Sequence, residues 1–203
     1  MSDTDDMNDP SSSSQHFINS LPAGCGPQRD ISLEAVWSLS SCKVEGFGIN
    51  QLLDDRTTLF WQSDGPQPHT ITIEFQKYTE ISFLLLYLDC KADESYTPQK
   101  IQVYTGHSIL DLEDPPKTIT LSEPVGWQAI DLRRDKQKFV RAFVVQVQIL
   151  QNHQNGRDTH VRACKVLGPI QEEMSTRKTI TVKDREFKKT IQDDLLLLDH
   201  CMR

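Results

Sequence analysis

The chain has 203 residues and a net charge of −7 at pH 7, with 37% hydrophobic and 25% charged residues. This length allows one large domain with tails or two small domains, and the modest apolar fraction favours one core with polar ends. The 29 acidic residues outnumber the 22 basic ones, and no basic stripe occurs. This balance argues against non-specific nucleic-acid binding, because phosphate contacts need clustered Lys and Arg.

Cysteine usage and the absence of targeting signals indicate the compartment. The five cysteines are odd in number, widely spread and without a CxxC pair, namely Cys25, Cys42, Cys90, Cys164 and Cys201. This pattern predicts free thiols in a reducing compartment, not a disulfide framework. No apolar h-region follows a basic N-terminal start, so we expect no secretory signal. The apolar run at 83–88 is too short to span a bilayer. We therefore expect a protein of the nucleus and cytoplasm with no membrane partner.

Composition divides the chain into three parts. Residues 1–30 are rich in Ser, Asp, Pro and Gly, which predicts a disordered N-terminal tail. Residues 31–170 carry the apolar segments and are predicted to form the folded domain. Residues 171–203 are strongly charged and form a C-terminal extension, with a possible lone strand at 179–182 and four leucines at 195–198. The leucines either pack on the domain or dock on a partner.

The domain contains a succession of short strands. Apolar residues alternate with polar ones, or form short buried-type runs, and turn signals separate the segments. Predicted strands cover residues 35–40, 69–75, 80–88, 99–105, 118–121, 127–132, 140–150 and 161–167. Residues 49–55 are compatible with a single helical turn that buries Leu52 and Leu53. Because no long helix lies between the strands, the pattern predicts an all-β fold, an antiparallel β-sandwich or barrel.

Trp61 lies in the aromatic segment that precedes a Gly-Pro turn. The ring could serve as an aromatic platform for a ligand. However, tryptophan is highly buried on average, so we expect Trp61 to pack in the core.

A dense polar loop at 152–160, with the sequence NHQNGRDTH, lies between two predicted strands. The pair Asn155-Gly156 is a strong turn signal because both residues tolerate positive φ. One interpretation is an ordinary hairpin loop that is polar because it faces water. The other is a recognition loop whose amides and imidazoles point toward a ligand.

Catalytic and metal-binding patterns are weak in this chain. It contains no Gly-x-Ser-x-Gly elbow, P-loop or GxGxxG motif. The acidic pairs Asp54-Asp55 and Asp93-Glu94 are typical of solvated loops. A zinc site could use His153, Asp158 and His160, but the only further ligand nearby, Cys164, is in a predicted buried strand. The sequence therefore predicts neither an enzyme nor a cofactor.

Several segments match one family and cover nearly the whole span from residue 33 to 169. They are AVWSLSSCK at 35–43, GFG at 46–48, QL at 51–52 with DD at 54–55, FWQSDG at 60–65 with QPH at 67–69, DESYTP at 93–98, and the polar loop at 152–160. In combination these segments resemble the DOC domain family. The resemblance implies a jelly-roll β-sandwich of the galactose-binding-like type.

The resemblance also implies a function. We expect a non-catalytic substrate-recognition and processivity subunit of the anaphase-promoting complex, a multisubunit E3 ubiquitin ligase that acts in the cell cycle. It would bind destruction-box substrates such as mitotic cyclins together with a WD40 coactivator, and would contact scaffold subunits of the ligase. The degron-binding residues implied by the matching loops are Asp93, Glu94, Ser95, Tyr96, Asn152, His153, Gln154, Asn155, Asp158 and His160.

The same resemblance implies a docking tail. Members of the family commonly end in Ile-Arg, which binds a TPR subunit, and this sequence has Met202-Arg203 at that place. Methionine is an unbranched apolar side chain of similar bulk, so the pair can still dock.

Two other functions remain as alternatives. A carbohydrate-binding module is one, because sandwiches of the galactose-binding-like class commonly bind sugars at their loop ends. A metal-dependent enzyme that uses His153, Asp158 and His160 is the other.

Overall fold

A computed structural model describes residue 21 and residues 25–113, 115–134 and 138–170. The predictions for residues 179–182 and 195–198, and for the docking pair Met202 and Arg203, lie outside these described residues. Within them, no helix is long and apolar enough to cross a membrane.

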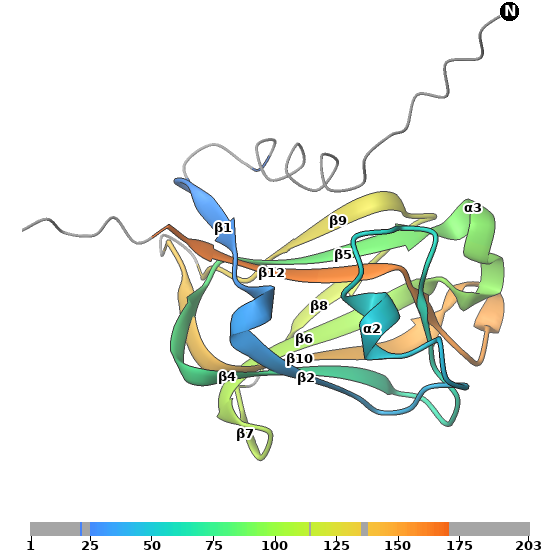
Figure 1. Cartoon of the computed structure of the whole chain (residues 1–203), viewed down its shortest axis with the longest axis horizontal. Helices are drawn as coiled ribbons and strands as arrows, with labels where there is room; N and C mark the ends of the chain where they lie inside the picture. Colours follow the sequence, from blue (N-terminus) through green and yellow to red (C-terminus); the bar gives the residue numbers. More distant parts are fainter. Residues whose placement is uncertain (1–20, 22–24, 114, 135–137, 171–203) are drawn as a thin grey trace, which may run out of the picture. The chain divides into compact units, whose positions relative to one another are not determined.

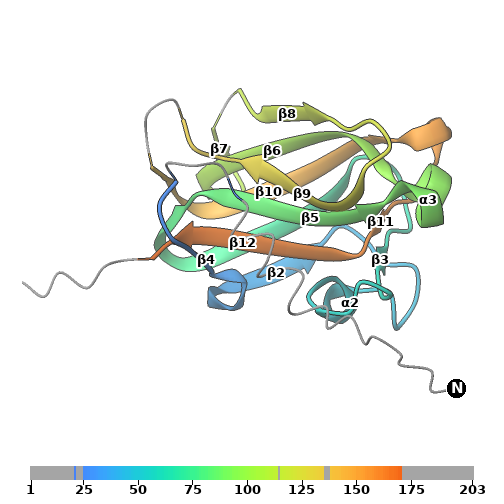
Figure 2. The same cartoon turned by 90° about the horizontal axis from the view of Figure 1, so that it is seen from above.

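Two antiparallel sheets face each other and form a sandwich (Figure 1, Figure 2). The four-stranded sheet has the order β1 (Gln28–Asp30), β12 (Ala163–Pro169), β5 (Phe83–Asp89) and β9 (Val125–Asp131). The six-stranded sheet has the order β2 (Ala35–Leu39), β4 (His69–Ile81), β10 (Val140–Asn152), β6 (Pro98–Ser108) and β7 (Asp111–Leu112), and β8 (Lys117–Thr120) also pairs with β6. A small ladder joins β11 (His160–Val161) to β3 (Trp61–Gln62).

The helices are short, as the sequence predicts. The α-helices are α2 (Ile49–Leu52) and α3 (Cys90–Asp93), and the 3-10 turns are η1 (Ser32–Glu34), η2 (Glu94–Tyr96) and η3 (His153–Asn155). Leu52 is fully buried in the core, and Leu53 packs against it partly exposed. The predicted all-β sandwich and its helical turn are therefore confirmed.

Strand β5 is buried on both faces. Leu84, Leu86 and Leu88 join the main core between the sheets. On the opposite face, Phe83 and Leu85 belong to a second cluster, which also contains Cys25 and Leu167, with Leu21 and Trp127 packed against it. The continuous apolar run of this strand follows from this double burial.

Two boundaries differ from the prediction. The predicted strand at 80–88 is divided at Ser82, because β4 ends at Ile81 and β5 begins in the other sheet. Composition assigns residues 28–30 to a disordered tail, but they form β1 on the edge of β12. Their sequence Gln-Arg-Asp lacks an apolar pattern, since this short strand is held by backbone pairing.

The cysteines that the structure describes are free thiols, as predicted. These are Cys25, Cys42, Cys90 and Cys164, and Cys201 lies outside the described residues. Burial raises the pKa of the Cys164 thiol well above its usual range.

Trp61 is a core residue, as expected. Its side chain is fully buried in the main core, and its indole Nε1 donates a hydrogen bond of 2.9 Å to the carbonyl of Ser41. The ring therefore cannot serve as a platform for a ligand in this conformation.

Replacing Trp61 by Ala is expected to lower the free energy of unfolding by about 3–5 kcal/mol, because it removes a large buried ring. Thermal unfolding followed by circular dichroism measures the loss. Leu110, which is 98% exposed, provides the control, and Leu110→Ala should leave the melting temperature unchanged. A Trp61→Ala protein as stable as the native chain would contradict the core assignment.

Candidate functional site

Three chain segments meet at one end of the sandwich. They are residues 63–69, which lead into β4, residues 90–97 between β5 and β6, and residues 152–160, which run from the end of β10 to the start of β11. Together they are called the loop end here. In both views α3 and the orange segment after β10 lie side by side (Figure 1, Figure 2). The sequence places polar residues in two of these segments, and the fold brings them together.

The polar loop is not a hairpin. Strand β10 belongs to the six-stranded sheet, and β12 belongs to the four-stranded sheet. The chain therefore crosses from one sheet to the other through residues 152–160 and the short strand β11, and residues 90–97 cross in the opposite direction at the same end. Each of these segments is consequently fastened to both sheets.

The two crossing segments touch through their backbones. A Cβ atom on Gly156 would lie only 1.8 Å from the carbonyl oxygen of Ser95, so no other residue fits there without moving the loops apart. The positive φ angles of the turn fall on Gln154 and Asn155, at 52° and 58°, whereas Gly156 has a φ of −57°. Glycine is thus required at position 156 by the close approach of the Ser95 backbone and not by a positive φ angle.

Hydrogen bonds reinforce this contact between the loops. The backbone amide of His153 donates to the carbonyl of Thr97 at 2.9 Å, and the Thr159 hydroxyl donates to the carbonyl of Tyr96 at 3.2 Å. These bonds fix the position of one loop relative to the other. They also satisfy backbone groups that would otherwise be buried without partners.

Asn152 acts inside the loop. Its side chain is fully buried, and its Nδ2 donates to the carbonyls of Asp158 at 2.7 Å and Gly156 at 3.2 Å. Asn152 therefore shapes the loop and does not face a ligand.

The third segment adds further support. Gln67 donates through Nε2 to the carbonyls of Gly156 and Arg157, at 3.1 and 3.2 Å. The buried His69 donates through Nε2 to the carbonyl of Arg157 at 2.7 Å. Both residues belong to segments that match the family, but the sequence predicts no role for either.

A buried ion pair connects α3 to the residue that precedes β12. Asp93 is 5% exposed and accepts hydrogen bonds from Arg162 Nε and Nη2, at 2.7 and 2.8 Å, and interacts with His160 Nδ1 at 3.0 Å. Burial raises the pKa of Asp93, but hydrogen bonds from His160 and Arg162 outweigh it, so the pKa lies below its ordinary value. The carboxylate stays charged and ties the two crossing segments together.

An aromatic stack leads from this ion pair to the surface. The His160 ring stacks between Phe60 and Tyr96, with both pairs of ring centroids 4.2 Å apart. The Arg162 guanidinium lies 5.6 Å from the centroid of Phe60. Tyr96, at the outer side of the stack, is 38% exposed. Tyr96 is therefore an accessible ring with a rigid backing.

The predicted degron-binding residues now fall into three groups. Glu94, Tyr96, Gln154 and Asn155 are exposed, and they can contact a ligand. Partly buried residues are Ser95, His153, Asp158 and His160. Asp93 and Asn152 are buried, so the structure gives them a supporting role instead of the predicted contact with substrate.

Sequence reasoning did not select Arg157, whose exposed side chain lies in the same polar loop. It also missed Arg162, because the partner of that residue, Asp93, is distant in the sequence. Among the described residues, no group of three His, Cys, Asp or Glu side chains is arranged to hold a metal ion. His160 from the suggested zinc cluster is instead engaged with Asp93.

Solved structures with the same architecture include carbohydrate-binding modules. A family 32 module from C. perfringens NanJ, in complex with galactose, superposes with a TM-score of 0.56 at 11% identity, covering 69% of this chain and 98% of that one. Chitosan-binding module 1 from Paenibacillus sp. IK-5 gives a TM-score of 0.51 at 16% identity, with 68% and 98% coverage. These likenesses show the predicted galactose-binding-like jelly roll and nothing about ligands.

Sequence relatives point to a single family. The family model described as "Anaphase-promoting complex, subunit 10 (APC10)" matches residues 5–192. "Anaphase-promoting complex subunit 10" of Homo sapiens is 44% identical over 162 residues, which cover 76% of this chain and 86% of that protein. "Anaphase-promoting complex subunit DOC1" of Saccharomyces cerevisiae is 37% identical over 141 residues, covering 68% and 55%. The resemblance to the DOC domain is thus confirmed, and the chain belongs to the family of anaphase-promoting complex subunit 10.

Proposed function

We propose that this chain is a non-catalytic subunit of the anaphase-promoting complex, and that its loop end binds an extended segment of the substrate. Its relatives carry the name of that complex, which supports the assignment. In this proposal the chain shares destruction-box substrates with a WD40 coactivator and acts in the nucleus and cytoplasm. It prolongs ubiquitination during each encounter with a substrate.

The observation that carries this proposal is the fixed contact between the two crossing loops. The close approach of Gly156 to Ser95 holds exposed side chains from both loops at constant separation. Gln154 and Asn155 present amides that both donate and accept hydrogen bonds, which suits the amides and carbonyls of an extended peptide. A rigid site binds with less loss of conformational entropy than a mobile one.

The expected affinity of such a site is low. A hydrogen bond to a peptide contributes only about 1 kcal/mol net, so a few contacts give weak binding. A second binding site on the coactivator, which holds the same substrate, would raise the apparent affinity without new contacts. Weak binding is therefore compatible with a co-receptor.

The proposal of a non-catalytic role rests on how the titratable groups are used. Asp93 and His160 have the residue types of a catalytic acid-base pair. However, the carboxylate is buried and shared with Arg162. Its contacts position the loops, which supports a binding role for this end of the sandwich.

Replacing Glu94, Gln154 and Asn155 together by Ala is expected to shorten the ubiquitin chains formed per encounter on a destruction-box substrate. These side chains are exposed, so the melting temperature and incorporation into the ligase should be unchanged. Their combined loss is about 2–3 kcal/mol of substrate binding, or roughly a 30- to 150-fold weaker site.

Gln76→Ala is the matched control, because Gln76 is exposed on β4 far along the strand from the loop end. Processivity in a single-encounter ubiquitination assay measures the effect. Unchanged processivity in the triple variant would refute the proposed site.

Asp93→Asn is expected to destabilise the chain by about 3–5 kcal/mol, because it leaves the Arg162 guanidinium without its carboxylate. The pKa of Asp93 is lower in the folded chain, so its stabilising effect is complete above the unfolded value of about 3.9. This stabilisation is lost as the pH falls through the lower folded pKa. The difference in melting temperature between the native and Asp93→Asn chains should therefore be full near neutral pH and shrink below about pH 4.

Asp54→Asn provides the control for this experiment. Asp54 also pairs with an arginine, Arg56, but this pair is on the surface and should contribute little. A pH-independent difference between the native and Asp93→Asn chains would argue against a stabilising carboxylate at position 93.

A further part of the proposal concerns the TPR subunit. Replacing Met202 and Arg203 by Ala should reduce the amount of this chain that co-purifies with a TPR subunit of the ligase. The apolar Met side chain and the donors of the Arg guanidinium would be lost together. The melting temperature of the domain should not change. Equal co-purification of the native and substituted chains would exclude this pair as the anchor.

A further inference from the structure

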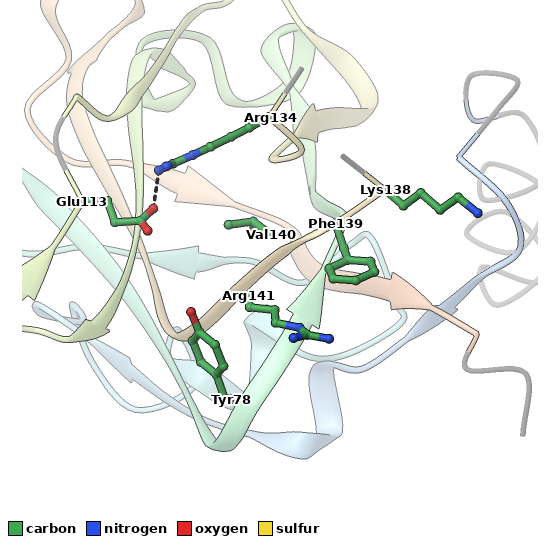
Figure 3. Close-up of a pocket in the computed structure, with 7 residues that line it drawn as sticks. All are labelled: Tyr78, Glu113, Arg134, Lys138, Phe139, Val140 and Arg141. Carbon is green, nitrogen blue, oxygen red and sulfur yellow. Dashed lines mark hydrogen bonds and ion pairs between the residues drawn. The ribbon is translucent and has the colours of Figure 1, made fainter. Parts of the chain in front are cut away.

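A second candidate surface lies at the end of the sandwich remote from the loop end, where β4 finishes and β10 begins. It is a groove of about 610 Å³, called the basic groove here. Two aromatic rings, Tyr78 and Phe139, line it together with Arg134, Lys138 and Arg141, and Glu113 lies on one side. Figure 3 shows the Arg134 side chain meeting Glu113, while Lys138 points away on the other side.

The cations of the basic groove are only partly neutralised. Arg134 pairs with Glu113, and Arg141 pairs with Glu80 at 2.6 Å. For Lys138, which is exposed, the described residues supply no ion pair. A neighbouring cavity adds Lys117 and Arg133, both close to Asp131. The described residues that line the groove and the adjoining cavity thus include five cations and one carboxylate, Glu113.

The wall of the basic groove is also aromatic. Tyr78 is 46% exposed, and it stacks on His107 and packs against Phe143, with ring centroids 5.4 and 5.2 Å apart. The Arg141 guanidinium lies 5.4 Å from the centroid of Phe139. This combination fits a peptide that carries several carboxylates and an occasional apolar side chain.

The chain itself contains such a peptide. Residues 1–28 hold four aspartates, Asp3, Asp5, Asp6 and Asp9, and no Lys or Arg. Met7 lies among these aspartates and offers an apolar side chain. We propose that this acidic segment, residues 3–9, docks in the basic groove of the same molecule.

The position at which the N-terminal chain joins the fold favours an intramolecular contact. Cys25 and Leu21 pack with Phe83 in the second cluster, and the Arg133 guanidinium lies 4.7 Å from the centroid of Phe83. The adjacent Ser82 hydroxyl donates to the carbonyl of Lys138 at 3.3 Å. The N-terminal chain therefore enters the fold beside the rim of the groove.

The connecting chain is long enough to reach. Asp9 and Leu21, which packs against the second cluster, are 12 positions apart in the sequence. A chain of this length spans up to about 40 Å when extended. Such a tether gives an effective concentration on the order of millimolar, so even weak charge pairing can keep the segment docked.

The test uses the full chain labelled with ¹⁵N. Changing Asp3, Asp5, Asp6 and Asp9 to Asn should move the amide resonances of Lys138, Phe139 and Arg141. Their new positions should match those of a chain that lacks residues 1–14. The native chain should approach the same positions at about 1 M salt, where the Debye length is only about 3 Å.

The control neutralises three exposed carboxylates elsewhere, with Glu45→Gln, Asp64→Asn and Glu123→Gln. These changes should leave the groove resonances in place. On the groove side, Lys138→Glu should release the segment without unfolding the domain, because Lys138 is exposed. Aspartate neutralisation should then cause no further shift in the Lys138→Glu chain.

Three outcomes would overturn the proposal. If the amide resonances of the groove do not move when the aspartates are changed, the segment does not dock. Shifts that grow with protein concentration would assign the segment to a second copy of the chain. Shifts that arise only when an acidic peptide is added from outside would assign the groove to a partner protein.

Discussion

The close backbone contact between Gly156 and Ser95 is the constraint on which the loop end depends. It brings two crossing segments within a distance that no other residue at position 156 would allow. Around this contact, the ion pair of Asp93 with Arg162 and the stacked ring of His160 fill the remaining space. The exposed amides of Gln154 and Asn155 then project from this support.

This arrangement explains how a site made of polar residues can be rigid. Polar loops usually face water and remain mobile, because few buried apolar groups hold them. Here the loops are short crossings between two sheets that share one apolar core. The buried residues Asp93 and Asn152 form hydrogen bonds within the fold, whereas the side chains of Gln154 and Asn155 are exposed to solvent.

Much of the fold could be predicted because alternation in β4 and β10 reflects a buried and a solvated face. Ile71 and Ile73 of β4 are examples, and both are fully buried. The assignment of each strand to one of the two sheets could not be predicted, because strands that are close in the sequence can belong to different sheets, as β10 and β12 do. The site shows the same division. Polar density located the loop at 152–160 and the family resemblance located residues 93–96, but the burial of Asp93 depends on Arg162, which is 69 positions away.

The crossing of both loops from sheet to sheet has a genetic consequence. Each crossing segment is attached to both halves of the sandwich, so its geometry depends on how firmly the two sheets pack. A substitution deep in the shared core could loosen that packing at elevated temperature without unfolding the chain. Conditional alleles that impair the loop end should therefore map to interior positions such as Val147 or Leu86 as well as to the surface loops.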